Sequence, residues 1–188
     1  ETAQMPNMYR KGEYDLAGCI VGVVDRAKII DGREIRPGDV ILGLASNGLH
    51  TNGYSLARKI LFQKMRLKIN SRLPGSKTTV GEELLRVHKN YQALLTKVPA
   101  GAIKGLAHIT GGGLIDNLPR ILPANCDAMI ETKSWKAPAI FQILQQNGDI
   151  DPEEMYQVFN MGIGMVAIVA PRHAAKITAT LRAKRIGR

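Results

Sequence analysis

Short apolar runs alternate along this chain with segments in which apolar residues recur at helical spacing. Continuous apolar runs bounded by turn residues predict buried strands, and they occupy residues 14–25, 40–46, 103–109, 127–131 and 164–170. The segments between them predict helices at residues 54–65, 79–98, 114–122, 137–148, 151–159 and 171–185. Strands that alternate with helices predict an α/β fold, with a layered mixed sheet and helices packed against it.

Capping and helix-breaking residues set the predicted boundaries of these helices. Thr79 and Glu82 have the spacing of a capping box, so a helix is predicted to begin there. Pro119 limits the first helical segment at 114–122 to about one turn. The last helix leaves few residues after it, where a further strand is expected, and the first residue is not methionine. We therefore expect this chain to be part of a longer protein.

The composition is that of an ordinary globular protein with an excess of positive charge. Hydrophobic residues make up 45% of the 188 positions, which is enough for one buried core. The formal net charge of +10 favours anionic partners. Aromatic residues are only 5% and do not interleave with the basic residues, which disfavours nucleic acid. Two explanations of the positive charge remain open: a solvated basic surface, and a site that binds phosphorylated small molecules.

Two further features bear on where the protein works. No apolar stretch approaches the roughly 20 residues that span a bilayer, so no membrane partner is expected. Cys19 and Cys126 lie far apart, outside any metal-binding spacing. We expect both to be buried, reduced thiols in a cytoplasmic protein.

A polar, glycine-containing loop follows the strand predicted at 40–46. In open α/β sheets ligands bind where strands end, and such a loop is suited to hold a phosphate or another part of a substrate. It lacks the GxxxxGK[ST] pattern of a P-loop and the GxSxG pattern of a hydrolase elbow. An ordinary turn with a helix cap is equally compatible with its composition. The candidate binding residues are Ser46, Asn47, Gly48, Thr51, Asn52 and Gly53, with His50 among them.

A second candidate loop has the sequence His-Ile-Thr-Gly-Gly-Gly at 108–113. It follows a predicted strand and offers three unobstructed backbone N–H groups in front of a helix, where anions are attracted. A flexible linker is the alternative. The candidate binding residues here are Thr110, Gly111, Gly112 and Gly113, with His108 beside them.

Histidines occupy equivalent places in these two loops. His50 and His108 each follow a predicted strand, and histidine can act as an acid, a base or an anion-binding donor near neutral pH. His88 and His173 lie on predicted helices, so we expect them to be surface or packing residues. Asn160 precedes the last predicted strand and is equally suited to bind a ligand or to cap the preceding turn.

Four sequence blocks occur in an order that resembles one enzyme family. They are ETAQMPNMY with GEYDLAG, ASNGLHTNGYSLARKIL, AHITGGGLIDNLPRILP and FNMGIGMV. Together they are similar to the aminoimidazole ribonucleotide synthetases, the phosphoribosylformylglycinamidine cyclo-ligases of purine biosynthesis. The resemblance covers nearly the whole chain. The family usually has serine where this chain has Asn47 and Thr51, and glycine where it has Asn7.

The resemblance implies a two-domain subunit of which this chain is a part. Residues 1–35 would be the C-terminal end of an N-terminal ATP-binding α/β domain whose remainder is missing. Residues 36–188 would form a C-terminal α/β domain, truncated at its end. The resemblance also implies a cytoplasmic homodimer that uses ATP and Mg²⁺. Because most of the N-terminal domain is missing, this chain alone is expected to be inactive.

The implied reaction is ATP-dependent ring closure of formylglycinamidine ribonucleotide to aminoimidazole ribonucleotide, ADP and phosphate. ATP would phosphorylate the formamide oxygen, an amidine nitrogen would attack the activated carbon, and phosphate would leave. The protein would position the reactants, stabilise charge and transfer protons.

The resemblance also suggests roles for the candidate residues. His50 and His108 would orient the formamide or move a proton, while the two loops and Asn160 would bind the substrate. Glu1 and Thr2 would face the nucleotide. Two alternatives remain: a sister ATP-dependent, amide-phosphorylating enzyme of the same fold, and a non-catalytic substrate-binding or assembly module.

Overall fold

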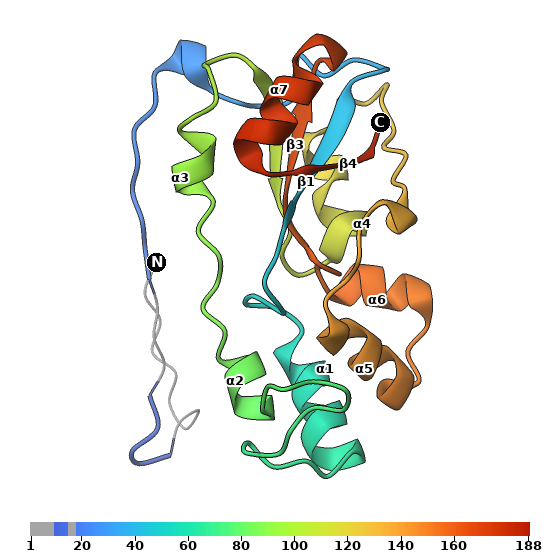
Figure 1. Ribbon diagram of the computed structural model, residues 1–188. Coiled ribbons are helices and arrows are strands. Elements are labelled where there is room, and N and C mark those ends of the chain that lie inside the picture. Colours follow the sequence, from blue (N-terminus) through green and yellow to red (C-terminus); the bar gives the residue numbers. More distant parts are fainter. Residues whose placement is uncertain (1–9, 15–17) are drawn as a thin grey trace.

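One four-stranded sheet forms the centre of the molecule in the computed structural model, which describes residues 10–14 and 18–188 (Figure 1). Its strands are β1 (Val40–Ala45), β2 (Ile103–His108), β3 (Ile163–Val169) and β4 (Lys184–Gly187), in the order β2-β3-β1-β4. The α/β class is confirmed. All strand pairs within the described residues are antiparallel, whereas the sequence pattern predicted a mixed sheet.

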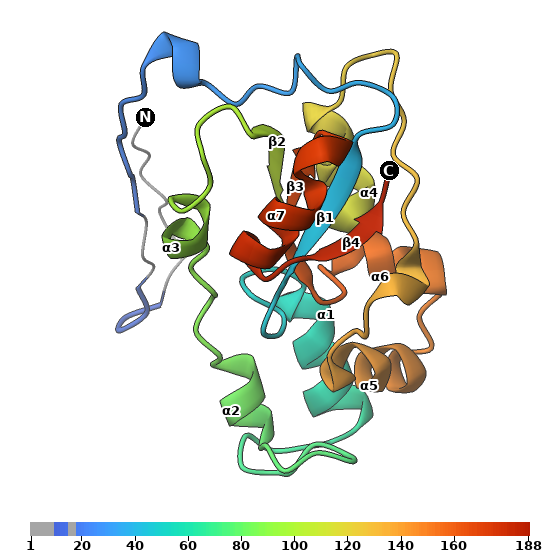
Figure 2. The ribbon, with the colours of Figure 1, turned by 45° about the horizontal axis from the view of Figure 1, so that its top comes forward.

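Helices cover both faces of the sheet and extend beyond one of its ends (Figures 1 and 2). The α-helices are α1 (Tyr54–Arg58), α2 (Val80–Leu84), α3 (Gln92–Leu95), α4 (Gly113–Asn117), α5 (Ala139–Gly148), α6 (Pro152–Val158) and α7 (Pro171–Leu181). A π-helical segment, Lys59–Lys64, continues α1, and 3₁₀ turns lie at Arg26–Lys28, Pro119–Ile121 and Thr132–Ser134.

Three apolar clusters hold these layers together. On one face of the sheet, Leu42 and Val169 pack with Ile177 of α7. On the other face, Ile168 lies in a cluster with Leu114 of α4. A third cluster, which includes the fully buried Phe141, Phe159, Leu61 and Met155, joins α1, α5 and α6 beyond the end of the sheet.

Several predicted elements are confirmed. Strands form at the predicted places in β1, β2 and β3, and helices form in α1, α5 and α6. The capping box is present, because the Glu82 N–H donates to Thr79 Oγ1 at 3.2 Å and the Thr79 N–H donates to Glu82 Oε2 at 2.7 Å. α4 is short and is followed by a 3₁₀ turn that begins at Pro119, as the proline predicts.

The long helix predicted at 79–98 is wrong. The chain forms α2 and α3 instead, and residues 86–91 between them are not helical. Tertiary hydrogen bonds hold this segment against the end of β1: the Tyr91 hydroxyl and Lys89 Nζ both donate to the Ala45 carbonyl, at 3.1 and 3.0 Å. Burial of Tyr91, which is 4% exposed, outweighs a weak local helical preference.

The prediction of a strand at 14–25 is also wrong. Those residues of this segment that the structure describes pair with no strand of the described chain. Val21 and Val23 are 87% and 101% exposed. This segment runs apart from the sheet (Figure 1), and a strand forms only where a neighbour satisfies its backbone groups. Cys19 is exposed and Cys126 is half-buried, so the expected burial of both thiols is wrong as well.

The C-terminal part differs from the prediction at two places. Within 127–131 only Ile130 pairs, as an isolated bridge to Gly187. The last helix ends at Leu181 rather than 185, since Arg182 adopts a left-handed conformation (φ 50°). The chain then forms β4 against β1, so the strand expected after the last helix is present. No helix among the described residues has the length and apolarity needed to cross a membrane.

Candidate functional site

Two loops meet at one edge of the sheet, where β1 and β2 end. β1 and β2 are both antiparallel to β3, so they run in the same direction and both end at the edge where β3 begins. The loop after β1 (residues 46–53, the first loop) therefore lies near the loop after β2 (residues 109–113, the second loop). The Asn52 side chain reaches the second loop, where its Oδ1 is 3.4 Å from the position of a Cβ on Gly111. The two predicted candidate loops are thus neighbours in space.

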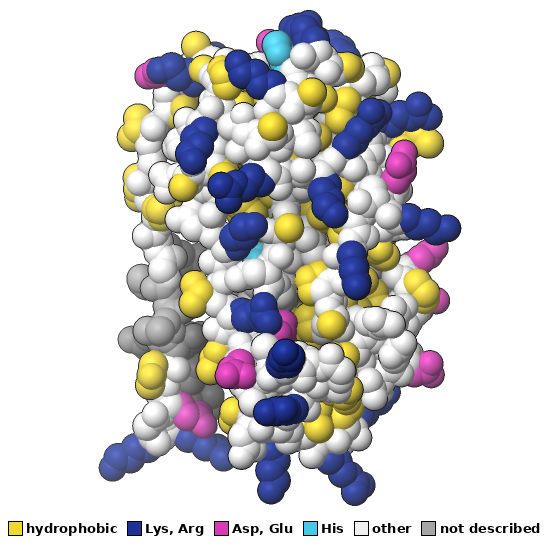
Figure 3. Space-filling model, in the orientation of Figure 1, with side chains coloured by type: hydrophobic (Ala, Val, Ile, Leu, Met, Phe, Trp, Pro, Cys, Tyr) yellow, Lys and Arg dark blue, Asp and Glu magenta, His cyan; other side chains and the backbone are white. Residues whose placement is uncertain are grey.

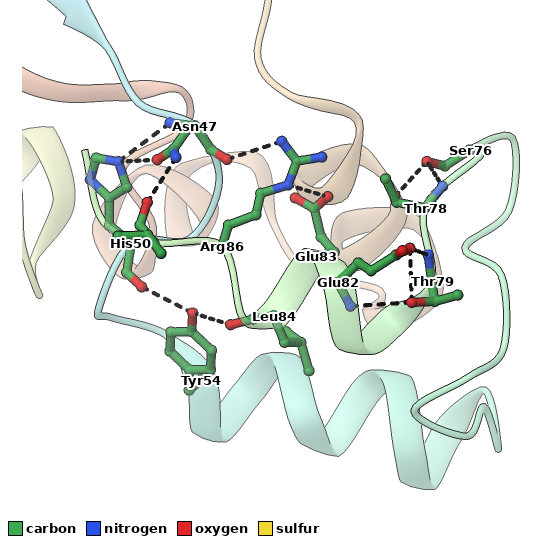
Figure 4. Close-up of polar contacts among 11 residues, drawn as sticks. Asn47, His50, Tyr54, Ser76, Thr78, Thr79, Glu82, Glu83, Leu84 and Arg86 are labelled. Atoms are coloured by element: carbon green, nitrogen blue, oxygen red, sulfur yellow. Dashed lines mark hydrogen bonds and ion pairs between the residues drawn. The ribbon is translucent and has the colours of Figure 1, made fainter.

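Tight packing determines the path of the first loop. Gly53 has a φ of +79°, and a Cβ there would lie 2.3 Å from the ring of Phe159, so only glycine fits. His50 also adopts a positive φ, +60°, which is uncommon for a residue with a side chain. The hydroxyl of Tyr54 donates to the His50 carbonyl at 3.0 Å and to the Leu84 carbonyl at 2.8 Å (Figure 4). These contacts join the loop to α1 and α2.

The side chain of Asn160 fixes the first loop through hydrogen bonds. Its amide nitrogen donates to the carbonyls of Gly48 and Leu49, at 2.9 and 3.2 Å. Its amide oxygen accepts from the Ser46 hydroxyl at 2.8 Å and from the Gly162 N–H at 2.9 Å. The side chain is buried and bonded entirely to the protein. Of the two roles considered for Asn160, this geometry favours the structural one.

His50 is buried and held in one orientation. Its Nε2 lies 2.8 Å from Asn47 Oδ1, and Asn47 Nδ2 donates to the Val87 carbonyl at 2.8 Å. The Asn47 amide therefore presents its oxygen to the ring, and Oδ1 can only accept a hydrogen bond. The Asn47 backbone N–H donates to the same ring nitrogen at 3.3 Å, so these two contacts favour opposite tautomers of His50. Nδ1 is buried and has no hydrogen-bond partner among the described residues.

The surroundings of His50 keep it uncharged. Burial, followed by the nearby His88, His108 and Lys89 in that order, lowers its pKa to about 4. His50 is only 5% exposed. At neutral pH it is therefore a neutral imidazole.

His88 lies between the two predicted histidines. Its ring stacks on that of His50 with centroids 4.0 Å apart and an interplanar angle of 24°. Its Nε2 is 3.2 Å from Nε2 of His108, and its Nδ1 is 2.9 Å from Thr51 Oγ1. His88 is half-buried and packs against His50, as expected of a packing residue, and it also contacts Thr51 in the first loop and His108 at the end of β2. His173 lies on α7, where its Nε2 accepts from Arg172.

His108 is the exposed member of this histidine cluster, which consists of His50, His88 and His108. Partial burial lowers its pKa, and the neighbouring His88 lowers it in the same direction. It ends β2 and faces the segment that carries His88. Of the two histidines predicted from the sequence, His108 is the one that a ligand can contact directly.

The second loop is organised by Asn117, which the sequence analysis missed. The amide nitrogen of Asn117 donates to the carbonyls of Gly111 and Gly113, at 3.1 and 2.8 Å, and its oxygen accepts from Thr110 Oγ1 at 3.1 Å. In the sequence, the signal that could have indicated this role was a single asparagine on an otherwise apolar face of the predicted helix. Not all three glycine N–H groups are unobstructed, since that of Gly113 donates to the Thr110 carbonyl at 3.0 Å. α4, with five residues, is also too short to develop a full helix dipole.

Charged residues flank the first loop. Glu83 is buried, which raises the pKa of its carboxyl, and the nearby Arg86 opposes this rise. The Nε of Arg86 lies 2.9 Å from Glu83 Oε2, and Arg86 Nη1 donates to the Asn47 carbonyl at 3.5 Å (Figure 4). Over the face shown in Figure 3, Lys and Arg side chains are spread out rather than gathered into one patch.

Two expectations about cofactors have no support among the described residues. No group of three or more His, Cys, Asp and Glu side chains in the described part of the chain could hold a metal ion. Glu1 and Thr2, the predicted nucleotide-facing residues, lie outside the described residues.

Sequence comparison identifies relatives for most of this chain. Residues 36–188 match the family described as AIR synthase related protein, C-terminal domain. The phosphoribosylformylglycinamidine cyclo-ligase of Syntrophus aciditrophicus is 50% identical over 182 residues, which are 96% of this chain and 52% of that protein. The enzyme of the same name from Geobacter metallireducens is 54% identical over 170 residues, which are 90% of this chain and 49% of that protein. The chain spans about half the length of the curated relatives it matches.

Solved structures share the fold at low sequence identity. Thiamine-monophosphate kinase from Stenotrophomonas maltophilia superposes with a TM-score of 0.55 at 15% identity, covering 88% of this chain and 51% of that chain. Hydrogenase maturation protein HypE superposes with a TM-score of 0.54 at 21% identity, covering 88% of this chain and 47% of that chain. By the match over residues 36–188, this chain belongs to the family of AIR synthase related proteins.

Proposed function

We propose that the protein containing this chain is a phosphoribosylformylglycinamidine cyclo-ligase of purine biosynthesis. It would close formylglycinamidine ribonucleotide to aminoimidazole ribonucleotide at the expense of ATP, releasing ADP and phosphate. The names of relatives at 50–54% identity support this assignment. The structural observation that carries it is the meeting of the two loops, with three histidines between them, at the edge where β1 and β2 end.

The two loops would bind the substrate, with the ribose 5′-phosphate as the favoured occupant of the second loop. Gly111 is exposed there, so its backbone is open to close approach. Asn52 lies beside it, and both Arg86 and Lys89 border the first loop. Positive charge near the site favours an anionic ligand. Binding of a phosphorylated substrate would therefore explain the excess of basic residues.

The histidines would act on the formamide and amidine groups. Because the pKa of His50 is lowered to about 4, this ring is neutral at pH 7 and would orient its neighbours rather than attract an anion by charge. His108 is exposed and would contact the substrate, either orienting the formamide oxygen or taking a proton from the attacking nitrogen. Positioning and charge stabilisation would supply most of the rate enhancement.

ATP and Mg²⁺ would be held elsewhere in the whole protein. The described residues provide no group of three or more His, Cys, Asp and Glu side chains for a metal ion. We place the nucleotide on the side of Glu1 and Thr2, in a domain of which residues 1–35 would be the end, with residues 36–188 as the second domain. A cytoplasmic homodimer is the proposed state of the whole protein.

The test is an assay of the full-length protein with formylglycinamidine ribonucleotide and ATP, measuring ADP and aminoimidazole ribonucleotide together. His50→Ala and His108→Ala should each lower kcat/KM well beyond threefold, and His173→Ala serves as the control. If both site variants stay within threefold of the wild type, less than about 0.7 kcal/mol of transition-state stabilisation is lost and their roles are refuted. ADP release with another amide substrate only would instead indicate a sister enzyme.

A further inference from the structure

We propose that His88 is a positioning residue that couples His50 to His108, so that the two loops act as one preformed site. The proposal rests on the proposed function, since it assigns His88 a role in the same site. His88 does not follow a strand and stands in a segment with helical periodicity, so its place in the sequence does not indicate this role.

Contacts on both sides of His88 fix the position of its ring. The carbonyl of Val87 accepts from Asn47 Nδ2 at 2.8 Å, and Nζ of Lys89 donates to the Ala45 carbonyl at 3.0 Å. The backbone of residues 86–91 is therefore attached to the end of β1 and to the first loop. The half-buried ring of His88 then stacks on His50 and reaches His108. A side chain held by its neighbours in this way is not a freely rotating surface group.

The hydrogen bonds of His88 link the tautomer of His108 to the Thr51 hydroxyl. Only one proton can lie between the two Nε2 atoms at 3.2 Å. If His88 donates it, the Nδ1 of His88 accepts from Thr51, and neutral His108 carries its own proton on Nδ1. If His108 donates it, the Nδ1 of His88 donates to Thr51, and Nδ1 of His108 becomes an acceptor. His88 thus determines whether the other nitrogen of His108 offers a donor or an acceptor to the substrate.

Burial, followed by the neighbouring rings, lowers the pKa of both His50 and His108. His88 faces the rings of His50 and His108, and Lys89 and Tyr91 lie on the same side of the site. A proton on His50 would be repelled by Lys89. His88 is accordingly one cause of the lowered pKa of both His50 and His108.

Two variants of the full-length protein test this coupling. His88→Phe keeps a flat ring for stacking but removes both nitrogens, and His88→Gln keeps hydrogen-bonding groups but removes the ring. His173→Phe, on α7, is the matched control for the loss of an imidazole. Nuclear magnetic resonance of ¹⁵N-labelled histidine side chains would report the tautomer and titration of each ring, and steady-state assays would give kcat and KM separately.

The expected result distinguishes a positioning role of His88 from a role in the stability of the fold alone. His88→Phe should lower kcat by about tenfold with little change in KM, change the tautomer balance of His108, and raise the pKa of both His50 and His108. His173→Phe should change none of these. The Gln variant should retain more of the wild-type kcat than the Phe variant, and it provides a second measurement if the Phe variant folds poorly.

Two outcomes would overturn the proposal. Unchanged ¹⁵N shifts and titration of His50 and His108 in both His88 variants would show that the rings are not coupled. A kcat within threefold of the wild type in His88→Phe, despite altered shifts, would show that the coupling does not position the reactants. A wild-type protein without cyclo-ligase activity would refute the proposed function, and the resonance experiment would still decide whether His88 couples the two loops.

Discussion

Replacing Asn160 by alanine should release the first loop and destabilise the protein. The substitution leaves the carbonyls of Gly48 and Leu49 and the N–H of Gly162 without the partner they have in the wild type. Each lost hydrogen bond contributes about 0.5–1.5 kcal/mol net, so we expect a loss of about 2–4 kcal/mol in the free energy of unfolding. For a chain of 188 residues this loss corresponds to a fall of roughly 5–15 °C in the melting temperature, and to a smaller fall in a longer protein.

Thermal and urea unfolding of the full-length protein would measure this effect, alongside kcat and KM. Asn147→Ala is the control, because Asn147 makes one side-chain hydrogen bond, to the Ile143 carbonyl at 2.8 Å, and should cost no more than about 1 kcal/mol. If Asn160→Ala is as stable as this control while KM rises more than tenfold, Asn160 binds the ligand directly and the structural role is refuted.

Three further substitutions or conditions test the packing and the electrostatics of the site. Gly113→Ala should destabilise by at least about 2 kcal/mol in urea unfolding, because φ is +57° and a Cβ would lie 1.9 Å from the Tyr156 carbonyl oxygen. Gly164→Ala should cost about 1–3 kcal/mol and reduce kcat/KM, since its Cβ would lie 2.2 Å from the Tyr91 hydroxyl and 2.6 Å from the His50 ring. Between pH 6.5 and 4 the unfolded chain binds more protons at His50 than the folded chain, whose His50 pKa is about 4. The free energy of unfolding should therefore fall by up to about 3 kcal/mol as the pH drops through this range, and His50→Asn should flatten that dependence; an unchanged slope would contradict the lowered pKa.

Local patterns in the sequence predicted the parts of the fold that depend on neighbouring residues. Continuous apolar runs mark β1 and β3, and the pairing of Thr79 with Glu82 marks the start of α2. The two glycine-containing loops were located by the strands that precede them. Each of these features depends on interactions within a few residues, which a periodicity or a cap describes well.

Non-local contacts decided the remaining features of the fold. The segment at 86–91 has helical periodicity, yet the burial of Tyr91 and its bond to Ala45 keep it from being helical. The apolar run at 18–25 has the composition of a strand but has no neighbour to pair with in the described chain. A strand or helix forms only when the whole structure satisfies its backbone groups and buries its apolar side chains.

The sequence by itself determined the order of the main elements, the two candidate loops and two of the three clustered histidines. The tertiary structure alone decided that all sheet pairs in the described chain are antiparallel, that Asn160 holds the first loop, and that His88 lies between His50 and His108. The physical reason is that short-range patterns record which residues favour a strand, a turn or a cap. The contact of His88 with His108, 20 residues apart, and that of the Asn160 side chain with the Gly48 carbonyl, 112 residues apart, depend on how the strands pair and which side chains become buried.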